Sequence, residues 1–136
     1  MPIDLEIRDE GLGVTWNCHG PTIIKDFIDA KNSLLASTEG LKKLRYIVVD
    51  VSSMEKVKLS LDEMERIVQD KRLAPIVFPG LLCAVASPTD LGYGLARVWE
   101  ALSDQSGWEI QVFRSRAEAE LWIQQRVKEK FGIELN

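Results

Sequence analysis

The stretch from Leu82 to Ile123 constrains the fold of this chain more than any other part of the sequence. The run Leu81 to Ala86 is apolar throughout, which is typical of a strand that is covered on both faces. A helix is predicted next, capped by Pro88 to Asp90. Trp108 to Phe113 alternates as an outer strand does, and Ser115 is expected to begin a last helix. This order indicates an α/β domain, because parallel strands need crossover connections between them.

The first half of the chain supplies three further strands and two further helices. Ile3 to Ile7 and Val14 to Cys18 alternate apolar and polar residues around a glycine-containing turn, which predicts a β-hairpin. Gly20-Pro21-Thr22 is expected to start the first helix, since proline is favoured near the first helical position. Leu44 to Val51 is rich in β-branched residues and predicts a central strand. Ser60 opens a capping box and is expected to begin the second helix.

The resulting element order is ββαβαβαβα. We therefore expect residues 1–136 to form a single α/β domain with a mixed, mostly parallel five-stranded sheet flanked by four helices. A chain of 136 residues with 46% hydrophobic residues is large enough to form one stable core without disulfides or bound metal ions.

Composition and terminal residues narrow the classes of function. A net charge of -4, with basic and acidic residues interleaved, gives no field that would attract nucleic acid. The apolar runs are far shorter than the roughly 20 residues of a membrane span, and the acidic start of the chain does not indicate export. Cys18 and Cys83 lie in predicted strands without metal-ligand spacing, so we expect two buried, reduced thiols. These features predict a cytoplasmic protein with no metal site and no cofactor.

The element order is similar to the SpoIIAA-like fold of STAS-type anti-sigma-factor antagonists, which is related in shape to CRAL-TRIO domains. Ala84 to Arg97, followed by Val112 to Arg114 and Ala117 to Ile123, looks like the carboxy-terminal signature of a bacterial group of small STAS-like proteins without an assigned activity. The resemblance implies a fold and leaves the activity open.

No complete catalytic constellation accompanies the fold. We expect a non-enzymatic binding or regulatory module that engages a protein partner or a small apolar ligand. The third predicted helix carries one cation, Arg97, and two aromatic residues with a polar group on the ring, Tyr93 and Trp99. Such residues are common in binding sites, so all three are candidate binding residues. The same residues would equally complete the core of a small domain.

For Gly92 and Gly94 we favour close packing of the helix against the sheet over a phosphate-binding turn, because Arg97 stands where the dinucleotide-binding motif needs its third glycine.

Two alternatives use other residues. Ser60 lies where kinase-switched antagonists of the resembling family carry an Asp-Ser-Ser-Gly motif, although here the loop Val57 to Leu61 lacks that aspartate and glycine. A phosphate there would sit favourably on a helix amino terminus, while plain capping explains the serine as well. The other alternative is a small hydrolase in which His19 works with the rim of the sheet around Asp50.

A homodimer is compatible with such a compact domain, but no segment of the sequence is distinctive enough to identify an interface.

Overall fold

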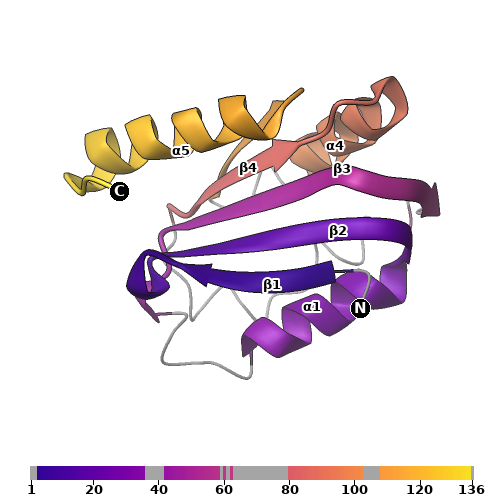
Figure 1. Ribbon diagram of the computed structural model, residues 1–136, viewed down its shortest axis with the longest axis horizontal. Helices are drawn as coiled ribbons and strands as arrows, with labels where there is room; N and C mark the ends of the chain where they lie inside the picture. The colour runs from indigo at the N-terminus through magenta and orange to yellow at the C-terminus, as the bar shows by residue number, and fades with distance from the viewer. Residues whose placement is uncertain are drawn as a thin grey trace.

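The computed structural model describes residues 3–35, 42–58, 60, 62, 80–102 and 108–135. Five strands form one sheet whose spatial order follows the sequence: β1 (Ile3–Arg8), β2 (Gly13–Ile23), β3 (Tyr46–Lys58), β4 (Leu82–Ala86) and β5 (Glu109–Phe113) (Figure 1). The described helices are α1 (Ile24–Leu35), α4 (Asp90–Leu102) and α5 (Arg116–Phe131). The predicted α/β domain with a five-stranded, mostly parallel mixed sheet is confirmed, since only β1 and β2 pair antiparallel. The predicted second helix lies outside the described residues apart from position 62.

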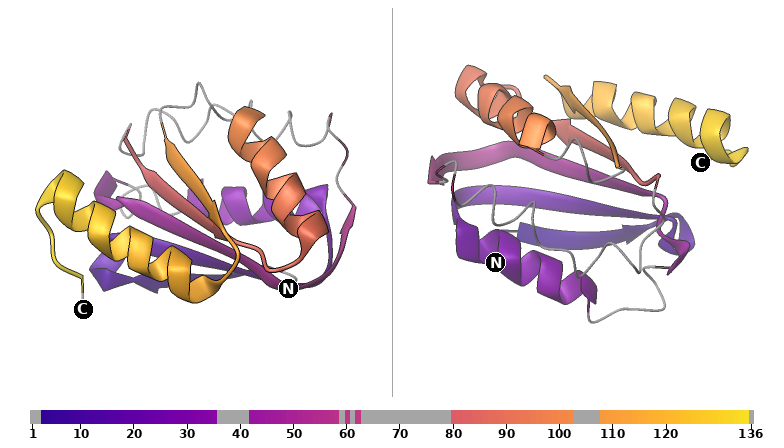
Figure 2. Two further views of the ribbon diagram at one scale, coloured as in Figure 1. Left: turned by 90° about the horizontal axis from the view of Figure 1, so that it is seen from above. Right: turned by 180° about the vertical axis from the view of Figure 1, so that it is seen from behind.

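The helices cover the sheet from both sides (Figure 2). Side chains of α1 and α4, including Ala30, Tyr93 and Ala96, pack against one face of the sheet. The other face carries α5, which buries Ala119, Ile123 and Val127. No helix within the described ranges is long and apolar enough to cross a bilayer.

The predicted hairpin is present, and its turn is a short 3-10 segment at Asp9–Gly11. The predicted start of the first helix is wrong, because Gly20-Pro21-Thr22 continues β2 and the helix begins only at Ile24. The strand accommodates the proline at an irregularity: the β2–β3 register shifts between Gly20 and Pro21, and Gly20 has φ +65°. Proline, which lacks an N–H donor, is tolerated in a sheet at such bulges. The central strand is also longer than predicted, since β3 runs past Val51 to Lys58.

The last helix begins where Ser115 predicts, with Arg116 as its first residue. The Ser115 Oγ accepts a hydrogen bond from the Glu118 N–H at 3.2 Å, and Gly132 ends the helix at φ +69°. A serine side chain that caps the amino terminus and a left-handed glycine that follows the last turn are both common at helix ends.

The two glycines of α4 differ in what surrounds them. A Cβ on Gly92 would lie 2.3 Å from the Ser87 Oγ, so the close packing that we predicted for this glycine is confirmed. A Cβ on Gly94 would meet no atom within 4 Å, so close packing does not explain that glycine. The glycine at position 92 lets α4 approach the end of β4, where Ser87 is buried.

Both cysteines are free and buried, as predicted. Burial raises the pKa of each thiol to about 12. A thiol with such a pKa is a poor nucleophile at neutral pH.

Candidate functional site

On the sheet face that carries α5, the described residues provide apolar cover over three of the five strands. Helix α5 packs on β3, β4 and β5 through apolar residues. On the same face, β1 and β2 present polar side chains instead; Asp4, Glu6 and His19 are exposed there, whereas Thr15 is fully buried. We call this surface the open half-face; it consists of Asp4, Glu6, Arg8, Thr15, Asn17 and His19.

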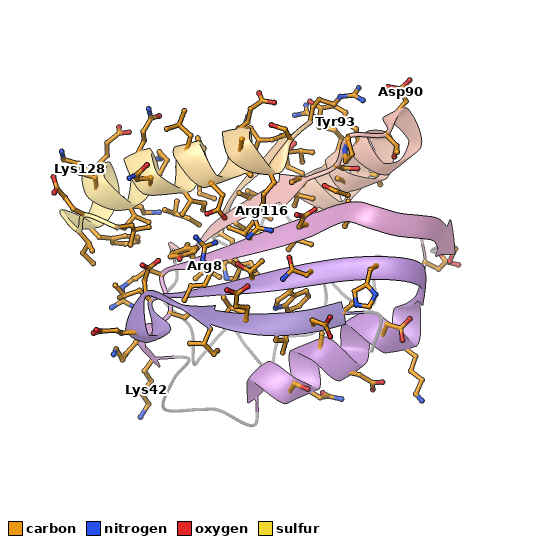
Figure 3. All side chains as sticks on the ribbon, viewed as in Figure 1. Arg8, Lys42, Asp90, Tyr93, Arg116 and Lys128 are labelled. Atoms are coloured by element: carbon orange, nitrogen blue, oxygen red, sulfur yellow. The ribbon has the colours of Figure 1, made fainter. Side chains whose placement is uncertain are left out.

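A network of two arginines and two carboxylates joins α5 to the open half-face. The Arg8 guanidinium donates two hydrogen bonds to the Glu120 carboxylate, both of 2.6 Å, and one of 3.1 Å to the Thr15 Oγ1. Arg116 donates through Nε to the Glu120 Oε1 at 3.1 Å and through Nη1 to the Asp50 Oδ2 at 2.9 Å. Figure 3 shows Arg8 and Arg116 between α5 and the strands. Because the contacts come from β1, β2, β3 and α5, the network fixes the helix across the sheet.

The network also sets the charge of its carboxylates. Burial acts to raise the pKa of Asp50, but hydrogen bonds from Ser52 and Arg116 outweigh it, so the net pKa is lowered. Burial likewise opposes ionisation of Glu120, and the hydrogen bonds from Arg8 and Arg116 reverse that effect and lower its pKa. The hydrogen bond to Glu120 is the main reason why the pKa of Arg8 is raised. Both carboxylates are therefore ionised and paired at neutral pH.

A cavity of about 260 Å³ lies beside this network. Its wall combines Arg8 and Glu120 with residues of α5 and of the end of the chain: Ala117, Leu121, Ile123, Gln124 and Leu135. Leu121 is 55% exposed although it is a large apolar residue. The Gln124 Nε2 donates to the Leu135 carbonyl at 3.4 Å, which holds the chain end against the helix. The result is a small amphipathic cavity with an exposed apolar residue in its wall.

The predicted binding residues lie on the other side of the sheet. Tyr93 packs against the core under α4, and the Arg114 guanidinium lies 4.0 Å from the centre of its ring. Arg97 pairs with Glu100 of the same helix at 3.1 Å. Trp99 belongs to α4, and its side chain lies outside the described part of the structure. These contacts give Tyr93 and Arg97 structural roles, and their part in binding stays a prediction.

The residues of the two alternative hypotheses are also placed. Ser60 is exposed, and the predicted helix behind it lies outside the described residues, so the phosphosite stays a prediction. His19 Nε2 lies 2.9 Å from the Asp4 Oδ2, whereas Asp50 is engaged by Arg116 and by the Ser52 N–H. No contact between described side chains joins His19 to a serine. Nor do three His, Cys, Asp or Glu side chains of the described ranges come together as metal ligands would.

Sequence reasoning missed the network and its cavity. The signal for the open half-face was present in the strict alternation of Ile3 to Arg8, whose polar members share one face. The pairing of Arg8 with Glu120 had no such signal, because the two residues are 112 positions apart in the chain.

Comparison with known proteins identifies the fold. No protein-family model matches the chain, and no curated protein matches it in sequence. Its structure is similar to that of an uncharacterized protein from the DUF3478 family with a SpoIIAA-like fold, from Shewanella loihica PV-4, with a TM-score of 0.58. The match covers 88% of this chain and 90% of that one at 15% sequence identity, a likeness of fold alone. The chain thus has the SpoIIAA-like fold that its element order predicted.

Proposed function

We propose that this chain is a non-enzymatic protein-binding module whose partner docks along α5, with one apolar side chain inserted into the cavity beside Arg8 and Glu120. The observation that carries this proposal is the position of Leu121. It is an exposed apolar residue in the wall of the cavity, and the same wall contains the charged side chains of Arg8 and Glu120. Binding surfaces of proteins commonly combine an apolar anchor with a polar surround.

The size of the cavity favours a side chain over a whole small ligand. Pockets for drug-sized molecules usually measure roughly 300–1,000 Å³ and enclose most of the ligand. The cavity here is about 260 Å³ and is bounded on one side by charged groups. A partner protein supplies a side chain of suitable size while the rest of its contact area lies outside the cavity.

The wall of the cavity is already ordered by its own contacts. Glu120 is held by Arg8 and Arg116, and Gln124 holds the end of the chain. A preorganised surface loses less conformational entropy on binding, which favours affinity for a protein partner.

The test is site-specific photo-crosslinking in the native host. A photo-reactive phenylalanine analogue replaces Leu121 in one variant and Glu129 in the control; Glu129 is an exposed residue of the same helix. We expect a defined adduct with another protein at position 121 that is absent at position 129 and is lost when Ala117→Trp fills the cavity. Equal adducts at both positions, no adduct at position 121, or an adduct insensitive to Ala117→Trp would each contradict the proposal.

A further inference from the structure

Strand β1 forms an unpaired edge of the described sheet. It pairs with β2 on one side, and no other strand of the described ranges lies on its other side (Figure 1). The Ile7 side chain on this strand is 64% exposed. An edge strand with free backbone groups and an exposed apolar side chain is a template for pairing with another strand.

The charges along β1 are complementary to a second, antiparallel copy of the same strand. A two-fold axis perpendicular to the sheet keeps each face of the sheet on the same side, so pairs form between residues of the same face. With Glu6 on the axis, Asp4 lies opposite the partner's Arg8, and Leu5 lies opposite the partner's Ile7. This register places an ion pair at each end of the strand, a Glu6–Glu6 pair on the axis, and two apolar pairs on the opposite face.

The two charged groups have hydrogen-bonding capacity for such a contact. A guanidinium has five N–H donors, and Arg8 uses three of them on Thr15 and Glu120. No described residue accepts from the remaining two. The Asp4 side chain is 63% exposed, and His19 contacts only one of its oxygens.

We propose that two copies of this chain associate through antiparallel pairing of their β1 strands, with Glu6 at the two-fold axis, to form one continuous sheet. The second copy would bring Asp4 of the partner subunit beside Arg8, and therefore to the edge of the cavity. This inference goes beyond the proposed function and does not depend on it, because it concerns self-association of the purified chain.

The first test is oligomeric state and cross-linking of the purified protein. Sedimentation from about 1 µM to about 500 µM should show a shift from the 15.4 kDa monomer to twice that mass. Glu6→Cys should form an intermolecular disulfide on mild oxidation, since opposite residues of paired strands lie within disulfide reach. Glu129→Cys on α5 is the control, and the native thiols give no background because they are buried. A monomer at every concentration, or equal disulfide formation in both variants, would overturn the proposal.

The register makes a second, opposite pair of predictions. Asp4→Lys places two cations opposite each other and should weaken the dimer at least about tenfold. Glu6→Gln removes the like-charge pair on the axis and should tighten the dimer about twofold to fivefold. Circular dichroism checks that each variant is folded. A tighter dimer with Asp4→Lys or a weaker dimer with Glu6→Gln would rule out this register. If β1 pairs only with strands of other proteins, the purified chain would sediment as a monomer, which would overturn the proposal.

Discussion

In the described part of the chain, the two faces of the sheet differ in how many strands contribute apolar side chains to the core. On the side of α1 and α4, all five strands contribute apolar side chains to one core, from Ile3 in β1 to Val112 in β5. On the side of α5, the apolar contribution comes from β3, β4 and β5 alone, and β1 and β2 are polar there. The sequence pattern matches this difference: the unbroken apolar strand β4 is buried on both faces, whereas the alternating strand β1 contributes only Ile3 and Leu5 to the core of one face. Among the described residues of the open half-face, Asp4, Glu6 and His19 are exposed.

The largest effect is expected where α5 closes its half of the face. Ile123→Ala removes a side chain that is 1% exposed and should lower the free energy of unfolding by about 2–5 kcal/mol, measured by urea denaturation. Leu121→Ala on the same helix is the control and should change it by less than about 1 kcal/mol, because that side chain is largely exposed. Equal losses would mean that the two sides of α5 are buried alike.

The fit of α4 to the opposite face is tested at its glycines. Gly92→Ala should destabilise the protein by about 1–3 kcal/mol, because the new methyl group would overlap the Ser87 hydroxyl. Gly94→Ala has open space and should stabilise the helix by about 0.5–1 kcal/mol. Thermal unfolding of the two variants side by side gives the comparison. A stable Gly92→Ala protein would show that α4 lies further from β4 than described.

The polar network should contribute less than the apolar contacts of α5. Arg8→Met leaves Glu120 with Arg116 as its remaining partner and should cost about 1–2 kcal/mol, since the pair is only partly shielded from water. Arg97→Met, which breaks a pair within α4 between the exposed Arg97 and Glu100, should cost less than about 0.5 kcal/mol. If urea denaturation gives equal values, the network does not help to hold α5 on the sheet.

The smallest effect is a pH dependence of the same network. The pKa values of Asp50 and Glu120 are lowered in the folded chain, so their stabilisation is complete above the ordinary carboxyl range and is lost as the pH falls through the lowered values. The free energy of unfolding should therefore begin to fall below about pH 5 and continue to fall below the ordinary carboxyl pKa values. The double variant Asp50→Asn with Glu120→Gln should show a shallower fall over this range. An unchanged slope would place the acid sensitivity elsewhere.

Local sequence signals predicted most of the fold and little of the candidate site. The strands, the last helix and its N-cap follow from alternation, apolar runs and residues such as Ser115, because these signals act over a few positions. The extension of β2 through Pro21 was missed because pairing with β3 overrides the local preference for a helix start. The contact of Arg8 with Glu120 depends on how α5 crosses the sheet, which neither residue's neighbours in sequence reveal.

The central claim is that a partner protein docks along α5 and inserts an apolar side chain into the cavity beside Arg8 and Glu120. The most direct test is the affinity of the partner trapped at position 121, measured by isothermal titration calorimetry for the wild type, Leu121→Asp and Glu129→Lys. We predict that Leu121→Asp weakens binding at least about tenfold, whereas Glu129→Lys changes it by less than about twofold. Equal affinity of the wild type and Leu121→Asp would contradict the claim.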